Sequence, residues 1–296
     1  MIGEFAALAT SVAFSFASTF LTLAGRRVGS MVLNRTRLVL AIAFLVITHW
    51  IVLGMPLPLQ DGSDRWLWLG LSGVVGLVIG DFFLFQAFVW IGPRLSMLMM
   101  ILAPVIAAFQ AWLFLGEIVT LGQMAGIALT LSGVAWVVMG RNPSGTARDK
   151  NYTRGILYGL GGAIGQATGL VLAKNGLSGD FSPISANLIR MISATVVLWV
   201  ITIIQGQAKE TVQTLVDNRN ALIFVLLGTF AGPFLGVSFS LLAIQNSAVG
   251  IASTLMALPP VFLLPISYFV FKERYSWGVI LGTLLAIVGV ALLFLI

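Results

Sequence analysis

Five polar or ionisable side chains interrupt the long apolar stretches of this sequence: Asp81, Gln86, Gln110, Gln166 and Lys174. An ionisable group inside hydrocarbon costs at least about 2.5–3.5 kcal/mol, so each one needs a function or a partner. Asp81 could bind a solute, exchange a proton, or lock helices together through a hydrogen bond. The glutamines could line a cavity or bridge neighbouring helices. Lys174 could bind a carboxylate or phosphate, or extend toward lipid headgroups.

Aromatic side chains crowd around Asp81 in the stretch "VIGDFFLFQAF". Phe85 and Phe88 follow the acid by four and seven positions, which places all three on one face of a helix. An acid beside aromatic rings suits a cationic or zwitterionic organic solute, through charge pairing and cation–π contact. Phenylalanines that face lipid are the alternative.

Residue patterns for catalysis, metal binding or ATP hydrolysis are not visible. The chain has no cysteine, one histidine (His49, beside Trp50) and scattered acids, with no H-E-x-x-H motif and no P-loop. We therefore expect no enzyme activity, cofactor or metal. The net charge of +6 comes from basic residues in short connections, which indicates membrane topology rather than nucleic-acid binding.

Composition places the elements in a membrane. The chain is 59% hydrophobic and 9% charged, against roughly 25% charged residues in a soluble domain. Apolar runs of the length that crosses a bilayer recur throughout. They predict an all-α polytopic membrane protein with ten transmembrane helices, near residues 3–24, 38–55, 66–90, 95–115, 121–139, 155–174, 184–205, 221–243, 250–271 and 277–296.

Lysine and arginine are distributed unevenly between the two sides of this topology. Three lie on the side of the termini: Arg65, Lys174 and Arg190. Thirteen lie on the other side: Arg26, Arg27, Arg35, Arg37, Arg94, Arg141, Arg148, Lys150, Arg154, Lys209, Arg219, Lys272 and Arg274. The positive-inside rule puts the richer side in the cytoplasm, so we expect a multi-pass cell (inner) membrane protein with both termini extracytoplasmic.

The second half of the chain repeats the first. At an offset of 156 residues Pro104 matches Pro260, and Glu117 matches Glu273. Matching glycines keep the same spacing: Gly76, Gly80, Gly122, Gly126 and Gly133 correspond to Gly232, Gly236, Gly278, Gly282 and Gly289. This predicts one five-helix repeat at 1–140, a linker at 141–154 and a second repeat at 155–296. Because five is odd, the second repeat must be inverted in the membrane.

The duplicated residues suggest mainly structural roles. Pro104 and Pro260 fall halfway along their spans and predict paired kinks beside a central cavity, whereas ordinary membrane-helix prolines are the alternative. Two "N-x-x-R" pairs, Asn34/Arg37 and Asn187/Arg190, stand at span entrances, where arginine can extend to headgroups. Glu117 and Glu273 precede helix caps, and Thr120-x-x-Gln123 has the form of a capping box.

The stretches "GDFFLFQAFVWIGPRLSMLMMILAPVIAAFQAWLFLGE" and "LAIQNSAVGIASTLMALPPVFLLPISYFVFKER" resemble the two halves of EamA-type proteins of the drug/metabolite transporter superfamily. The resemblance implies two inverted five-helix repeats around a cavity. It also implies a secondary transporter, exporting or exchanging a small organic metabolite or drug-like solute by alternating access. A coupling proton is left open, and a channel or non-transporting structural membrane protein is the alternative. Many relatives keep their termini in the cytoplasm, so the orientation expected here departs from the family.

Overall fold

The computed structural model describes residues 2–58, 62–115, 120–139, 150–176, 181–246, 255–272 and 276–295, and all regular structure in these ranges is helical. The first half contains α1 (Ile2–Val28), α2 (Ser30–Leu53), α3 (Ser63–Gly73), the π-helix η1 (Val74–Gly80), α4 (Asp81–Met100), α5 (Leu102–Leu115) and α6 (Leu121–Met139). The second half contains α7 (Lys150–Gly176), α8 (Pro183–Ile204), α9 (Ala208–Asp217), α10 (Arg219–Thr229), the π-helix η2 (Phe230–Gly236), α11 (Val237–Asn246), α13 (Pro259–Phe271) and α14 (Trp277–Leu295).

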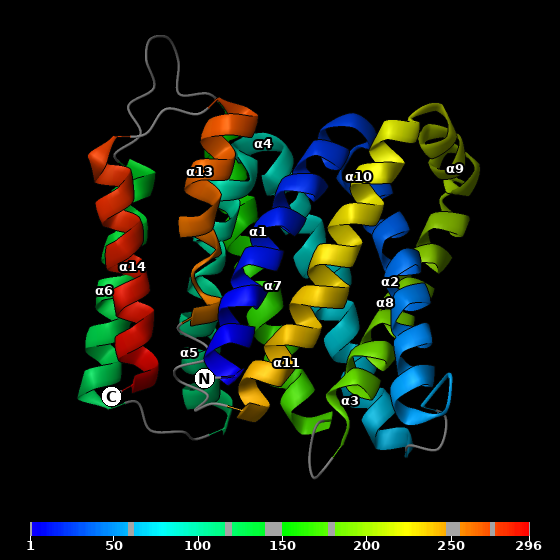
Figure 1. Ribbon diagram of the computed structural model, residues 1–296, viewed down its shortest axis with the longest axis horizontal. Helices are drawn as coiled ribbons and strands as arrows, with labels where there is room; N and C mark the ends of the chain where they lie inside the picture. The colour runs from blue at the N-terminus through cyan, green and yellow to red at the C-terminus, as the bar shows by residue number, and fades with distance from the viewer. Residues whose placement is uncertain are drawn as a thin grey trace.

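The long helices run side by side, and both chain ends lie at the same end of the bundle (Figure 1). Within the described ranges, seven helical stretches are long and apolar enough to cross a membrane: Ile2–Val28, Ser30–Leu53, Ser63–Met100, Leu121–Met139, Asn151–Ala173, Pro183–Ile204 and Arg219–Ser240. The all-α, multi-pass class is therefore confirmed, whereas the number of ten crossings stays a prediction.

Several helix boundaries differ from the predicted spans. α2 begins at Ser30, eight residues before the predicted start, because only Gly29 (φ 81°) separates it from α1; Arg37 therefore lies inside the helix. The turn between the third and fourth predicted spans is Gly92 (φ 80°), followed by Pro93, which cannot continue the preceding helix. α9 lies in the connection between the predicted spans 184–205 and 221–243. α7 begins at Lys150, within the predicted linker.

The internal repeat extends to the irregular helical turns. η1 and η2 are seven residues long and start 156 residues apart, at Val74 and Phe230. A π-turn is rare and costs regular hydrogen bonding, so two of them at equivalent positions are unlikely to be independent. The duplication thus reproduces local backbone geometry as well as residue identity.

The glycines of α6 and α14 make a close, crossed contact. A Cβ added at Gly133 would lie 2.6 Å from the carbonyl oxygen of Gly282, and one at Gly126 would lie 2.8 Å from that of Gly289. Gly126 and Gly133 are the repeat equivalents of Gly282 and Gly289, so the earlier glycine of each helix meets the later glycine of the other. The two equivalent helices therefore run antiparallel, as an inverted repeat requires. They form a pair at one edge of the bundle (Figure 1).

Candidate functional site

The π-helix η1 places a carboxylate inside the protein and frees a carbonyl beside it. The backbone N–H of Asp81 donates to Gly76, five residues back, instead of to Leu77. The Leu77 carbonyl, which an α-helix would have bonded at this point, instead accepts from Asn34 Nδ2 at 3.0 Å. π-turns often occur at functional sites because they free backbone groups in this way.

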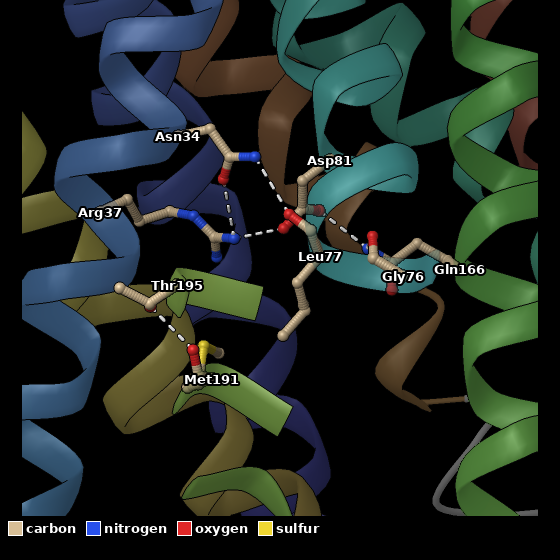
Figure 2. Close-up of polar contacts among 8 residues, drawn as sticks. All are labelled: Asn34, Arg37, Gly76, Leu77, Asp81, Gln166, Met191 and Thr195. Atoms are coloured by element: carbon tan, nitrogen blue, oxygen red, sulfur yellow. Dashed lines mark hydrogen bonds and ion pairs between the residues drawn. The ribbon is translucent and has the colours of Figure 1, made fainter. Parts of the chain in front are cut away.

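Asp81 is held by side chains from two other helices (Figure 2). Arg37 Nη2 on α2 forms an ion pair with Asp81 Oδ2, and the two side chains are only 6% and 5% exposed. Gln166 Nε2 on α7 donates to Asp81 Oδ1 at 2.8 Å and to the Gly76 carbonyl at 3.2 Å. We call Asn34, Arg37, Asp81 and Gln166 the acid network. It ties α2 and α7 to the junction of η1 and α4.

Arg37 also occupies the aromatic face that the sequence associated with Asp81. Its guanidinium carbon lies 4.9 Å from the ring centroid of Phe85, within the range of a cation–π contact. Phe85 and Phe88 are each 2% exposed, so they pack inside the protein and do not face lipid. In this conformation both the acid and the ring are already engaged by an internal cation. The expectation that Arg37 extends to headgroups is wrong.

The second arginine of the duplicated pairs approaches the same region from α8. A Cβ at Gly73 would lie 2.3 Å from the Arg190 carbonyl, so the two backbones touch there. A Cβ at Gly76 would lie 3.4 Å from Arg190 Nη2. Arg190 and Asp81 interact electrostatically, but no hydrogen bond joins them. Each repeat contributes one arginine to this region, but only the first contributes an acid, since the repeat equivalent of Asp81 is Val237. Two equivalent arginines therefore approach one carboxylate.

The predicted glutamines take different places. Gln166 belongs to the acid network. Gln86 accepts a hydrogen bond from Ser30 Oγ at 2.6 Å, at the turn between α1 and α2. Gln110 Nε2 donates to Thr168 Oγ1 at 2.8 Å and so bridges α5 and α7, while its buried Oε1 has no hydrogen-bond partner. The structure therefore brings Asp81, Phe85 and Gln166 together and leaves Gln86 and Gln110 elsewhere. The Lys174 side chain lies outside the described residues.

Both predicted kink prolines stand at helix starts, each just after a break. α4 ends at Met100, and Pro104 is in the first turn of α5. Pro260 is the second residue of α13, after the break at Ala257 and Leu258. Proline is tolerated in a first helical turn because its missing N–H has no intrahelical partner there. Ile101 (φ −60°, ψ −21°) and Leu258 (φ −78°, ψ −5°) keep helical backbone angles, so each interruption is a short turn, and the role of the two prolines as gating kinks stays a prediction.

Serines of α1 satisfy backbone groups at one of these breaks. Ser11 Oγ donates to the Leu255 carbonyl at 2.5 Å, and Ser15 Oγ donates to the Pro259 carbonyl at 3.2 Å. The Leu255 carbonyl would bond residue 259 in an α-helix, but Pro259 has no N–H to donate. Sequence reasoning missed this contact. Its signal was the spacing of hydroxyl residues along one face of "TSVAFSFASTFLT".

Other expected features have mixed outcomes. The capping box is confirmed, since Thr120 N donates to Gln123 Oε1 at 2.9 Å and Gln123 N donates to Thr120 Oγ1 at 3.2 Å. Glu117 and Glu273 lie outside the described residues. Two open surface hollows of about 630 and 510 Å³ lie beside α9 and the start of α10, and no member of the acid network lines either one.

Comparison with solved structures supports the fold. Twenty-eight chains of solved structures match; one, titled only as the crystal structure of a protein, aligns with a TM-score of 0.64 over 98% of this chain and 96% of that chain. At 18% identity this likeness concerns the fold alone. No curated protein sequence matches the chain.

A family model accounts for nearly the whole sequence. The EamA-like transporter family matches residues 1–139 and again residues 153–295, one match for each repeat. The two matches fall on either side of the connection between α6 and α7. By its sequence, its two-repeat layout and its apolar helices, the chain belongs to the EamA-like transporter family.

Proposed function

We propose that this protein is a secondary carrier that exports or exchanges a small organic solute by alternating access. The family indicates membrane transport of small solutes. The observation that carries the mechanism is the pairing of irregular backbone at equivalent positions, namely η1 with η2 and the break before Pro104 with the break before Pro260. Two similar, inverted halves with matched weak points can exchange conformations, which gives one state open to each side of the membrane.

The acid network is the candidate for the part of the carrier that responds to solute or proton. It lies inside the helical bundle, joins helices of both repeats, and includes an acid that the scaffold duplication does not require. Uptake or release of a proton by Asp81 would alter its pairing with Arg37 and Gln166 and so change how α2 and α7 hold η1. If transport is coupled to a proton, we propose that Asp81 is the group that carries it.

Reconstitution tests the carrier proposal. A thermal-shift screen of the purified protein against a metabolite library identifies a bound solute, and liposomes containing the protein are then preloaded with that unlabelled solute. We expect saturable counterflow, in which external labelled solute accumulates transiently against its own gradient. A non-saturating ohmic current without counterflow would instead identify a channel. Absence of both would leave a structural membrane protein.

The proposed site of action is the inner membrane, with the termini outside the cytoplasm. The arginine-rich connections support this orientation through the positive-inside rule. The chain ends lie together at one end of the bundle, which suits an even number of crossings (Figure 1).

A further inference from the structure

The two duplicated "N-x-x-R" pairs differ in how their donors are used. In the first repeat Asn34 donates to the Leu77 carbonyl and Arg37 pairs with Asp81. In the second repeat the equivalent Asn187 Nδ2 is buried and has no hydrogen-bond partner, whereas the Nε atoms of Arg37 and Arg190 are both buried and unbonded. Within the part of the chain that the structure describes, the guanidinium of Arg190 forms no hydrogen bond and no ion pair. The second pair therefore has the donors of the first without its acceptors.

The charges are unequal for the same reason. Val237 stands at the position equivalent to Asp81 in the second repeat. Among the described residues Arg37 and Arg190 both interact with Asp81, and the ion pair is with Arg37. One positive charge on a membrane-spanning helix is left without a direct partner. Such a charge is costly, and intramembrane ionisable groups without a structural partner mark ligand sites by default. Contact of its backbone with Gly73 keeps Arg190 in this region.

We propose that Arg190, with Asn187 three residues before it on the same face of α8, binds the carboxylate of a small organic monoanion. This inference rests on the proposed carrier function and names its substrate class. A guanidinium presents donors in a planar fork that a carboxylate matches with two oxygens. The Asn187 amide adds a further donor. The substrate carboxylate thus takes the role in the second repeat that Asp81 has in the first.

Charge balance selects a monoanion. Arg37, Asp81 and Arg190 together carry one positive charge in excess, which one carboxylate neutralises. A phosphate monoester, with about two negative charges at neutral pH, would leave an excess negative charge in the bundle. A cationic solute is disfavoured, because it would have to displace Arg37 from both Asp81 and the Phe85 ring.

Acetate is the minimal probe, because it carries the proposed group without a particular carbon skeleton. Purified protein in an uncharged detergent, which supplies no anionic headgroups, is heated with acetate, acetamide or methylammonium at constant ionic strength and pH. We expect only acetate to raise the Tm, by about 2 °C when its concentration is roughly five times the dissociation constant. No acetate-dependent shift up to 100 mM, or equal shifts with acetamide, would overturn the proposal.

Variants of Arg190 separate ligand binding from a structural role. Arg190→Gln should abolish the acetate shift without lowering the Tm of the unliganded protein, since it removes a charge that has no direct partner. Arg190→Lys should weaken the shift, because an ammonium cannot form the fork. Arg27→Gln, at the exposed end of α1, is the matched control and should retain the full shift. A large loss of unliganded stability in Arg190→Gln would show that the arginine is structural.

An acid supplied by the chain itself provides the complementary test. A Cβ at Gly76 fits without a close clash and lies 3.4 Å from Arg190 Nη2, so Gly76→Asp can place a carboxylate against the guanidinium. This variant should fold and lose the acetate response, while Gly76→Asn, of the same shape but uncharged, should keep more of it. Equal responses of the two variants would contradict the proposal.

Counterflow distinguishes this inference from the carrier proposal. If the protein exchanges an uncharged or cationic solute equally well with and without Arg190, the carrier proposal stands and the anion site fails. If acetate binds through Arg190 but no carboxylate is exchanged, the anion site stands and the carrier proposal fails.

Discussion

The ion pair between Arg37 and Asp81 lies inside the bundle and joins α2 to α4. Both side chains are almost fully buried, and Gln166 satisfies the second carboxylate oxygen. A buried pair of this kind need not stabilise the fold relative to apolar residues. Removing only one partner, however, leaves the other charge buried without compensation. The free energy of unfolding of variants at Arg37 and Asp81 therefore shows whether the two residues interact.

A double-mutant cycle at this pair should show strong coupling. Asp81→Asn leaves Arg37 unpaired and should lower the free energy of unfolding by about 3–5 kcal/mol, and Arg37→Gln should do the same for Asp81. The double variant should recover much of that loss. Thermal unfolding of the three variants in detergent measures the cycle. If the two losses simply add, the contact is not an interacting pair.

Among the helices, the interruptions in the two repeats are the features that would allow movement. The backbone breaks before Pro104 and before Pro259, and the second break is held by Ser11 and Ser15 of α1. A break whose carbonyls bond side chains from another helix can rearrange at lower cost than a continuous helix. Hinges of this kind often control turnover.

Pro104 and Pro260 occupy equivalent positions of the two repeats. Replacing both with alanine should slow the exchange of solute across the membrane while solute binding persists. Alanine restores an N–H at each position, which can bond the carbonyl four residues back, Met100 or Met256, and so stiffen each interruption. The exchange rate in liposomes and the thermal shift with solute measure the two effects separately. Unchanged turnover would return these prolines to ordinary helix starts.

The glycines at the contact between α6 and α14 should not tolerate replacement by a residue with a side chain. A Cβ at Gly133 would lie 2.4 Å from the backbone nitrogen of Ala286, so Gly133→Ala must push the helices apart, at a cost of about 1–3 kcal/mol. Gly62→Ala is the control, because nothing lies within 4 Å of a Cβ there. Comparable thermal stability of the two variants would mean that this contact is looser than described.

For the molecule as a whole, orientation decides the direction of transport. Cysteines introduced at the exposed Ile2 and at Ile296 should react with an impermeant reagent applied to intact cells, whereas one at Ser144 should stay protected until the membrane is opened. The reason is the excess of arginine and lysine on the Ser144 side. The cysteine-free chain provides its own unlabelled control. Labelling at Ser144 alone would reverse the assignment.

Much of this architecture could be predicted from the sequence, since apolar runs indicate membrane helices and matched glycines, such as Gly133 with Gly289, indicate a duplicated set of helices. The acid network could not. Arg37 can extend to headgroups or turn inward with the same composition around it, and the choice depends on an acid at the right depth of another helix. That depth is set by η1, whose π-turn leaves no distinctive residue pattern.

In alternating access the two repeats exchange conformations, so the protein opens to one side of the membrane as it closes to the other. Distance measurements between spin labels test this directly. One pair is at Arg26, in the last turn of α1, and Lys209, at the start of α9. The other pair is at Val52 and Asn175, near the ends of α2 and α7. The end of α1 and the start of α9 lie at one end of the bundle, and the ends of α2 and α7 lie at the other (Figure 1). The proposal predicts two distances for each pair, and any condition that lengthens one pair, such as added solute or a change of pH, should shorten the other. A single unresponsive distance at each end, or lengthening at both ends together, would contradict alternating access.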